Sequence, residues 1–429
     1  MLDVRLIRED PDGVAARLRT RGGDAWKLVA EVVATDGRRR ALETERQELQ
    51  GERNRRSKEI GAQKKAGGDT SEVEAAVRAI GHRISEVGEE ADAADRHQRD
   101  LLLSIPNLPH AECPVGEDET ANPQIRQWGD KPVFGDGFEP ADHVTIGERL
   151  GLFSFEDGAR LAGSGYVVFR GQGARLQRAL IQFLLDIQTR EHGYEEIAPP
   201  FVVSRDCMVG TTQLPKFEDD MFGLEDGALF LIPTAEVPVT NLCRETILKA
   251  DELPKKMTAY TPCFRREAGS AGRESKGLIR MHQFDKVELV QVVAPDRSMA
   301  ALDELTGHAE AVLRALGLHY RVIELCTGDL GFGAAKTYDL EVWAPGHGTY
   351  LEVSSCSNFG DYQARRMHLR CKNADGKNVF CHTLNGSGTA LPRLYVALLE
   401  TFQQPDGGVM IPAPLAAYFG ADSIPAPGA

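Results

Sequence analysis

The sequence predicts an α+β protein, in which a hairpin of two long antiparallel helices precedes a domain built on an antiparallel β-sheet flanked by helices. Two observations support this prediction. From Ala25 to Leu103 the chain is polar, helix-prone and free of proline, with one break at Ala66-Gly67-Gly68-Asp69. Farther along, strand-like runs recur without intervening helices, which is typical of an antiparallel rather than a doubly wound parallel sheet.

Composition sets the broad class of the protein. At 429 residues the chain is long enough for two or three domains with a large core. It has no run of eighteen apolar residues, and Met1–Arg5 does not begin a secretory signal, so neither a membrane span nor export is expected. Eight cysteines without framework spacing fit reduced thiols. A cytoplasmic location is therefore predicted.

The helical hairpin is predicted over about residues 26–103. Its second half keeps the 3-4 apolar spacing of a coiled-coil seam, at Val73, Val77, Ile80, Ile84, Val87, Ala91, Ala94, Gln98 and Leu101. The first half keeps this spacing through Leu28, Val32, Leu42, Leu49 and Ile60, with Arg39, Arg46, Arg53 and Arg56 interrupting it. Ser71 and Glu74 are expected to form a capping box at the start of the second helix. A helix of roughly 35 residues gives an arm of about 50 Å.

Basic residues gather on the first helix of this arm, whereas the second helix is acidic. The basic set is Arg38, Arg39, Arg40, Arg46, Arg53, Arg55, Arg56, Lys58, Lys64 and Lys65. A basic stripe on a thin arm suits contact with an RNA backbone by shape. The net charge of −14 does not exclude this partner, because binding depends on where basic residues cluster. From the arm alone, a dimerisation or spacer hairpin with solvated charges remains an alternative.

The remaining chain is predicted to divide into a linker and a second domain. The boundaries are 1–110 for the amino-terminal domain, 111–138 for a linker rich in Pro, Gly and Asn, and 139–429 for the sheet domain. A helical period runs from Gly171 to His192 and precedes the segment Gly193–Pro200. Strand-like runs follow at Leu229–Ile232, Thr258–Phe264, Gln283–Val293, Thr337–Val342 and Thr349–Val353.

No standard phosphate loop is present in the sequence. The pattern GxxxxGK[ST] is missing, and the glycines of Gly269–Gly277 lie between strands and open no helix, unlike a dinucleotide-binding fingerprint. A bound nucleotide would have to be held by arginines and strand-borne carboxylates. The stretch around Arg265 offers these groups, because Arg grips phosphate through two donors. Glu267 is expected on the same side of a strand as Arg265, and Phe284 offers a flat surface for a base.

Phe264–Arg273 with Gly277–Glu288 resembles motif 2 of class II aminoacyl-tRNA synthetases, in the form found in seryl-tRNA synthetases. Other segments resemble the same family in the same order: Thr234-Ala235-Glu236, Glu352–Asn358, and Asn385–Arg393, which resembles motif 3. The helix and strand over 171–200 resemble motif 1. Together with the hairpin, the resemblance covers nearly the whole chain. It implies a class II synthetase catalytic domain, a homodimer formed through motif 1, and an arm that holds the long variable arm of the tRNA.

The activity implied by the resemblance is that of a serine–tRNA ligase. Such an enzyme uses ATP to attach L-serine to tRNA(Ser), and to tRNA(Sec), through a seryl-adenylate. The serine carboxylate attacks the α-phosphorus and releases pyrophosphate, and the terminal ribose hydroxyl of the tRNA then takes the seryl group. Neither step needs a side-chain nucleophile, because positioning and charge neutralisation can supply the catalysis.

The resemblance also implies which residues form the site. The catalytic residues are Arg265, Glu267 and Arg393. ATP would be bound by Arg265, Arg266, Glu267, Met281, Phe284, Glu352, Val353, Ser354, Ser355 and Arg393. Serine would be bound by Thr234, Ala235, Glu236, Arg265, Glu288, Asn385 and Ser387. The tRNA would contact Arg39, Arg46, Arg53 and Arg56. Glu352 and Ser355 are hard oxygen ligands that suit Mg²⁺ shared with the phosphates.

Within this set, the expected roles are specific. Arg265 would hold the α-phosphate and the serine carboxylate, and Arg393 the γ-phosphate. Glu267 would accept from the adenine amino group, with Phe284 stacked on the ring. A carboxylate such as Glu236 would pair with the serine ammonium. A small pocket built to hydrogen-bond a hydroxyl rejects alanine, because its own polar groups would be left unpaired.

Two departures from simple expectation stand out. His368, Cys371, Cys381 and His382 lack the spacing of a zinc knuckle, so no zinc is expected. Thr212 stands where the family usually has glycine, and since Thr disfavours a positive φ, a slightly different loop shape is expected there.

Three alternatives to the ligase remain. A paralogue that loads serine onto a carrier protein or small molecule would be expected to have lost the basic hairpin. A relative selective for another amino acid would not need the set Thr234, Glu236, Glu288 and Ser387. A non-catalytic RNA-binding relative would have no use for Arg265, Glu267, Glu352 and Arg393 together.

Overall fold

The computed structural model describes residues 1–268 and 277–428. The chain divides into two compact units, Met1–Leu108 and Pro109–Ala429. Among the helices of these described residues, none is both long enough and apolar enough to cross a membrane.

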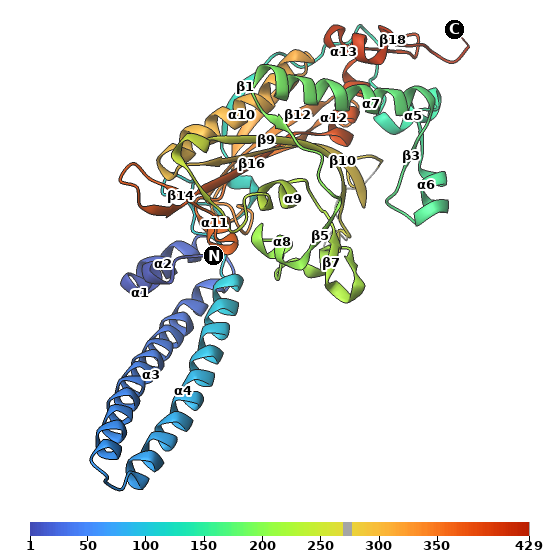
Figure 1. The fold of residues 1–429 in the computed structure, drawn as a ribbon. Coiled ribbons are helices and arrows are strands. Elements are labelled where there is room, and N and C mark those ends of the chain that lie inside the picture. Colours follow the sequence, from blue (N-terminus) through green and yellow to red (C-terminus); the bar gives the residue numbers. More distant parts are fainter. Residues whose placement is uncertain (269–276, 429) are drawn as a thin grey trace. The chain divides into compact units, whose positions relative to one another are not determined.

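The first unit is a helical hairpin with a small helical base. Its elements are α1 (Val4–Glu9), α2 (Pro11–Arg19), the short turn η1 (Ala25–Lys27), α3 (Leu28–Lys65) and α4 (Ser71–Ser104). Helices α3 and α4 run side by side and are joined by a turn at their far end (Figure 1). This confirms the predicted two-helix arm.

The predicted seam of the hairpin is the side on which α3 and α4 meet. Leu42, Val87, Ala91 and Ala94 are buried there, with Leu49 packed against them. The seam residues of α4 nearer the tip are only half-buried, and on α3 the four arginines at seam positions are half-buried as well. The apolar core of the arm is therefore concentrated toward its base.

The start of α4 differs from the predicted capping box. Ser71 is the first residue of the helix, and its amide and hydroxyl donate to Asp69 Oδ1 at 2.9 and 2.6 Å. The Thr70 hydroxyl donates to Glu74 Oε1 at 2.9 Å. The capping-box prediction was wrong because Thr70, not Ser71, stands at the N-cap, and the amide and hydroxyl of Ser71 donate to Asp69, two positions earlier.

The second unit is built on an eight-stranded sheet. Its strand order is β1-β11-β12-β13-β16-β10-β9-β4. All neighbours are antiparallel except β4 and β9, which run parallel. The strands are β1 (Gln124–Trp128), β11 (Tyr320–Glu324), β12 (Lys336–Ala344), β13 (Thr349–Asn358), β16 (His382–Ala390), β10 (Gln283–Val293), β9 (Lys255–Phe264) and β4 (Glu195–Glu196). The predicted antiparallel sheet is confirmed.

Three features of this unit differ from the sequence prediction. Helices α9 (Glu236–Asn241) and α10 (Ser298–Ala315) interrupt the succession of predicted strands, and α11 (Tyr362–Met367) follows the last of them. The run Leu229–Ile232 forms β7 (Leu229–Leu231), which pairs with β5 and β6 in a separate small sheet. Strand β1 lies inside the segment 111–138 that was predicted as a linker, and it forms one edge of the main sheet.

The two faces of the sheet are covered differently, as the alternation along β10 shows. Val287 and Leu289 join a large core with helices α7 (Gly171–Asp186), α10 and α12 (Leu391–Thr401). These helices lie along the sheet in Figure 1. Val290 and Val292 join a second core with α9 (Glu236–Asn241) and α11. The polar residues Lys286 and Glu288 share the parity of Val290 and Val292, so they point to the face that α9 partly covers.

Shorter elements complete the unit. They are α5 (His143–Leu150), α6 (Phe155–Ala162), α8 (Arg205–Gly210), α13 (Ala413–Phe419), the π-helical turn η3 (Ile187–Glu191), and the short helical turns η2 (Glu119–Ala121), η4 (Glu218–Asp220), η5 (Glu225–Gly227), η6 (Ala250–Glu252) and η7 (Pro295–Arg297). The short strands are β2 (Phe153–Ser154), β3 (Val168–Phe169), β5 (Val202–Ser204), β6 (Gly223–Leu224), β8 (Ile247–Leu248), β14 (Arg370–Lys372), β15 (Asn378–Phe380), β17 (Val409–Met410) and β18 (Ser423–Ile424).

Candidate active site

A cavity of about 780 Å³ opens on the polar face of the main sheet. Most of the predicted site residues line it: Thr234, Glu236, Arg265, Glu267, Met281, Phe284, Glu288, Glu352, Val353, Ser355, Asn385, Ser387 and Arg393. They come from the start of α9 and the segment before it, from the segments that follow β9 and precede β10, from β10, β13 and β16, and from the start of α12. Segments separated by as much as 159 positions in the chain therefore meet in one cavity.

A register shift in β13 explains how Glu352 and Ser355 come to line the same cavity. Leu340 pairs with Ser354 and Glu341 pairs with Glu352, so Val353 is an extra residue without a partner. Strict alternation would put Glu352 and Ser354 on one face. The bulge moves Ser355 to the face of Glu352 and turns Ser354 away.

A second bulge in β16 shapes the wall that carries Asn385 and Ser387. Val287 pairs with Thr389 and Glu288 with Ser387, leaving Gly388 unpaired in the ladder. Asn385 and Ser387 precede the bulge and Ala390 follows it, and all three line the cavity. Gly388 of the predicted motif 3 is thus the residue at which the register of β16 against β10 changes.

Arg265 and Glu267 lie beyond the end of β9, which stops at Phe264. Arg265 Nε donates to the carbonyl of Pro233 at 3.2 Å, and its guanidinium lies 5.1 Å from the centre of the Phe284 ring. Glu267 has a φ of +51° and is ion-paired with Arg280. The expectation that strand alternation aligns these two residues was wrong, although both line the cavity. Residues 269–276 of the predicted motif 2 turn lie outside the described residues.

Three predicted residues do not line the cavity. Ser354 is buried, and its hydroxyl donates to the carbonyl of Ser387 at 2.6 Å. Ala235 is fully buried just before α9. Arg266 is exposed, its amide donates to the Asp220 carbonyl, and its guanidinium lies 5.9 Å from the Phe222 ring centre. The first two support the positions of residues that do line the cavity.

Two carboxylates, Glu236 and Glu288, are buried at one end of the cavity. Burial raises the pKa of Glu236 to about 7, and the nearby charge of Glu288 adds to the rise. Burial also raises the pKa of Glu288, while Lys286 beside it opposes the rise. Asn385 Nδ2 donates to Glu288 Oε1 at 3.1 Å. Such an end favours a small cationic group, because a cation would stabilise both charged carboxylates.

Gln363 and Lys286 are site residues that sequence reasoning missed. Gln363, on α11, donates from Nε2 to Glu236 Oε1 at 2.6 Å and accepts from the Thr383 hydroxyl at 2.7 Å. It is 1% exposed, so it holds the Glu236 carboxylate from the protein side. No local signal marks Gln363. Lys286 could have been found, since it stands two residues before Glu288 on the same strand face.

Arg393 closes the other side of the cavity from the first turn of α12. Its Nη1 donates to the carbonyl of Glu352 at 2.7 Å and lies 3.6 Å from Glu352 Oε2, and its Nε donates to the carbonyl of Ile279 at 3.3 Å. Pro392 stands in the same turn, where the missing amide costs no helical bond. The guanidinium is therefore fixed before any ligand arrives.

The oxygen groups around Glu352 form a set that fits a hard divalent cation. Glu352 is half-exposed, and Asp339 on the neighbouring strand is buried. Burial raises the pKa of Asp339 well above its usual value, and the charge of Glu352 adds to this, while a hydrogen bond from Ser355 opposes it. Asp339 Oδ1 is buried and has no hydrogen-bond donor among the described residues. A buried carboxylate oxygen without a donor suits a cation at Glu352 and Ser355.

Three of the four arm arginines predicted to contact RNA form ion pairs within the arm. Arg39 lies 3.5 Å from Asp36 and 4.0 Å from Asp95, Arg46 lies 3.4 Å from Glu43, and Arg56 lies 2.8 Å from Glu52. Their side chains are 27 to 41% exposed. By contrast, Arg38, Arg40, Arg55, Lys58, Lys64 and Lys65 of the basic set are exposed. Surface ion pairs of this kind are weak, so the arginines can exchange partners.

Two further sequence expectations can be compared with the structure. Thr212 has a φ of +77°, so it adopts the conformation that threonine was expected to avoid, and it lines the cavity. The loop keeps the backbone that a glycine would give. His368 is exposed, His382 Nδ1 lies 2.8 Å from the Ser298 hydroxyl, and Cys371 and Cys381 are buried. Among the described residues, these four do not form a cluster of metal-ligand atoms. That no zinc is bound stays a prediction.

Known proteins resemble this chain along its whole length. The family model described as the seryl-tRNA synthetase N-terminal domain matches residues 1–109, and that of the tRNA synthetase class II core domain (G, H, P, S and T) matches residues 217–402. A serine–tRNA ligase of Akkermansia muciniphila is 66% identical over 424 residues, covering 99% of each chain. One of Paraburkholderia phytofirmans is 52% identical over 427 residues, covering 98% of each.

Solved structures show the same likeness. The seryl-tRNA synthetase from Pyrococcus horikoshii complexed with ATP is 37% identical, with a TM-score of 0.93, and the match covers 99% of this chain and 100% of that one. The cytoplasmic serine–tRNA ligase of Naegleria fowleri in complex with AMP is 29% identical, with a TM-score of 0.89, covering 100% and 99%.

Proposed function

The chain belongs to the seryl-tRNA synthetase family, and on that basis we propose that it uses ATP to attach L-serine to tRNA(Ser), and to tRNA(Sec), through a seryl-adenylate. The observation that carries the proposal is a cavity whose lining combines two arginines held by backbone carbonyls, Arg265 and Arg393, with the buried carboxylates Glu236 and Glu288. Similarity to synthetases solved with ATP and AMP supports a nucleotide in this cavity.

The amino-acid end of the cavity fits serine. The serine ammonium lies against Glu236 and Glu288, which gain a counter-ion for charges that burial disfavours. Asn385 and Ser387 face the hydroxyl of the serine substrate. Thr234 forms the adjacent wall of the cavity, and the buried Ala235 supports it from behind. Polar groups that hydrogen-bond a hydroxyl reject alanine, since alanine would leave them unpaired in a buried site.

The nucleotide end positions the reacting groups. Arg265 neutralises the α-phosphate while the serine carboxylate attacks the phosphorus and pyrophosphate leaves. Arg393 pairs with the γ-phosphate, and Arg266 assists from the exposed side. Phe284 and Met281 hold the adenine face, and Glu267 accepts from its amino group after exchanging its contact with Arg280. Val353 and Ser354 support the strand that carries Glu352. Catalysis then comes from alignment and charge neutralisation rather than from a covalent enzyme intermediate.

Mg²⁺ would be held by Glu352 and Ser355. When bound, the ion neutralises phosphate charge and orients the leaving pyrophosphate. Glu352 is suited to this position because Arg393 holds its backbone carbonyl and lies beside its carboxylate, which is half-exposed and faces the cavity.

The arm, the dimer and the location complete the proposal. The exposed basic side of α3 contacts the backbone of the tRNA together with Arg53, and Arg39, Arg46 and Arg56 exchange their ion-pair partners to join it. A homodimer forms through the motif 1 region, and the tRNA substrate places the reaction in the cytoplasm. The arm domain ends close to the predicted limit of residue 110, and the catalytic domain, predicted over 139–429, also takes in the segment 111–138 because β1 belongs to the main sheet. The intact hairpin disfavours a carrier-loading paralogue.

The test is serine-dependent exchange of pyrophosphate into ATP, paired with charging of purified serine tRNA. Both are measured with the intact chain and with a chain in which residues 26–103 are replaced by a short linker. Exchange by both, with charging only by the intact chain, is expected. Exchange without charging by the intact chain would favour the carrier-loading alternative. No exchange with serine would overturn the assignment.

A further inference from the structure

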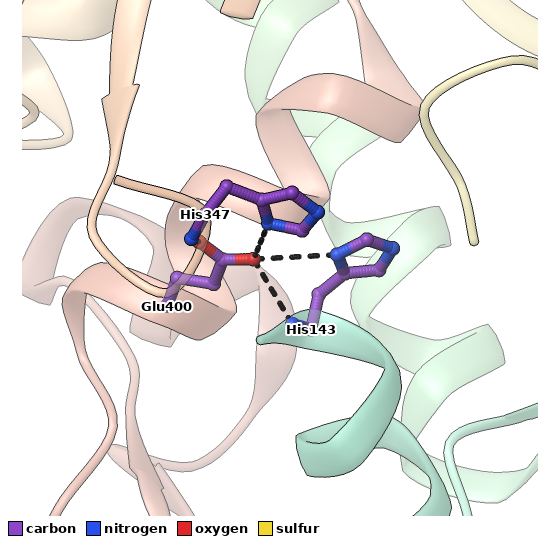
Figure 2. A group of neighbouring side chains, drawn as sticks. All are labelled: His143, His347 and Glu400. Carbon is purple, nitrogen blue, oxygen red and sulfur yellow. Dashed lines mark hydrogen bonds and ion pairs between the residues drawn. The ribbon is translucent and has the colours of Figure 1, made fainter. Parts of the chain in front are cut away.

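The carboxylate of Glu400, on α12, is the centre of a buried cluster outside the substrate cavity (Figure 2). Its Oε1 accepts from the amide of His143 at 2.9 Å and lies 3.3 Å from His143 Nδ1 and 2.7 Å from His347 Nδ1. Its Oε2 accepts from the amides of Gly346 and His347 at 2.9 and 3.2 Å. The two imidazole rings stack with centres 5.1 Å apart.

The tautomer of His143 follows from the hydrogen bond that its other ring nitrogen, Nε2, makes with Leu278. The amide of Leu278 donates to His143 Nε2 at 3.0 Å, so that nitrogen carries a lone pair. In a neutral imidazole the hydrogen is then on Nδ1, where it is donated to Glu400. His143 therefore links a carboxylate on α12 to the backbone amide of Leu278.

This arrangement argues against a metal ion between the three side chains, although their ligand atoms lie within 4.8 Å of one another. A cation on His143 Nδ1 would move the hydrogen to Nε2, where it would face the N–H of Leu278. Two donors facing each other in a buried site are costly. The cluster is a hydrogen-bond relay, and its outer end is Leu278.

Leu278 belongs to a wall of the substrate cavity. The consecutive residues Leu278, Ile279, Arg280 and Met281 all line it. The carbonyl of Ile279 accepts from Arg393 Nε at 3.3 Å. Helix α12 thus holds this short segment at two points. Glu400 acts through His143 on the amide of Leu278, and Arg393 binds the carbonyl of Ile279.

Gly277 shows how close the contact is. It has a φ of +71°, and a Cβ there would lie 2.1 Å from His143 Nε2. A residue with a side chain would both strain the backbone and displace the imidazole. The close approach of the chain to His143 therefore depends on the glycine at position 277 and on the hydrogen bond from the amide of Leu278.

We propose that His143, oriented by Glu400, is a positioning residue for nucleotide binding. It fixes the cavity wall 278–281 and, through Ile279, the guanidinium of Arg393. The inference rests on the proposed function, in that the cavity must bind ATP. His143 touches no substrate atom, and its effect is on the affinity for ATP rather than on recognition of serine.

The test compares three variants. His143→Asn keeps an N–H for Glu400 but is too short to accept from Leu278, whereas His143→Gln carries an oxygen that reaches farther. His347→Asn is the matched control, because His347 also bonds Glu400 but does not contact the wall. The readouts are the Kd of ATP by calorimetry without serine, the KM of serine, and amide exchange of the peptide containing Leu278 by mass spectrometry.

For His143→Asn the Kd of ATP is expected to rise about tenfold, since an unsatisfied buried donor loosens the wall. The Leu278 peptide exchanges faster, and the KM of serine is unchanged. His143→Gln falls between this variant and the original chain, and His347→Asn leaves Kd and exchange unaltered. Unchanged exchange in His143→Asn, or an equal rise of Kd in His347→Asn, would overturn the inference. If the original chain binds no ATP at all, the proposed function fails, and the exchange readout still decides whether His143 holds the wall.

Discussion

Replacing Glu236 by Gln isolates the energetic cost of a buried carboxylate in the amino-acid end of the cavity. The side chain is 5% exposed, and burial raises its pKa to about 7 from the ordinary 4.5. At about 1.4 kcal/mol per pH unit, this difference of about 2.5 corresponds to about 3 kcal/mol. Between pH 4.5 and 7 the folded protein binds the proton more tightly than the unfolded chain. Its free energy of unfolding therefore falls as pH rises through this window and is level above it.

The assay is urea unfolding of the original chain and Glu236→Gln at pH 4.5, 6 and 8. Glutamine cannot ionise, so the free energy of unfolding of the variant does not fall between pH 4.5 and 7 on account of this residue. Its stability relative to the original chain is expected to improve by up to about 3 kcal/mol between pH 4.5 and pH 8. Glu195→Gln, on an exposed residue, serves as the control and should show no such trend. Parallel pH profiles for the original chain and Glu236→Gln would refute the reasoning.

Three further predictions concern the same site and the arm. Gln363→Leu removes the donor to Glu236, so the KM of serine in pyrophosphate exchange should rise about tenfold while the Kd of ATP stays the same. Glu352→Gln should raise the Mg²⁺ concentration that gives half-maximal exchange by about tenfold, measured by titration at fixed ATP, because a charged oxygen ligand is lost. The double change Arg55→Ala and Lys58→Ala, at exposed positions of α3, should raise the KM for tRNA by roughly three- to tenfold and lessen its salt dependence, with exchange unaffected.

The sequence predicted best the elements whose burial repeats over many residues. The strand Gln283–Val293 was predicted with the bounds it has, because it is buried along most of its length. The seam of α4 was likewise predicted from its 3-4 spacing. Strand β1 was missed because all five of its residues are exposed, so its sequence carries no alternation. An edge strand of this kind is defined by its partner, which lies about 200 positions away in the chain.

Local register was beyond what the sequence could give. The prediction placed Ser354 in the site with Glu352, as strict alternation would, yet the bulge at Val353 brings Ser355 to the face of Glu352 and turns Ser354 away. The same holds for Arg265 and Glu267, whose spacing of two was read as a strand although β9 ends before them. A bulge depends on how two strands pair, and the residue pattern along one strand does not show which residues of the partner strand lie opposite.

The buried carboxylates explain why the polar face of the sheet is not filled with apolar side chains. Glu236, Glu288 and Asp339 all have a raised pKa, with burial as the largest cause, and each reduces the stability of the empty protein. A core selected for stability alone would replace them by apolar residues of similar volume. A ligand that brings an ammonium group and a divalent cation relieves the cost at both ends of the cavity. Serine, and Mg²⁺ with ATP, are therefore each expected to raise the midpoint of thermal unfolding, because each binds the native state and relieves a buried charge there.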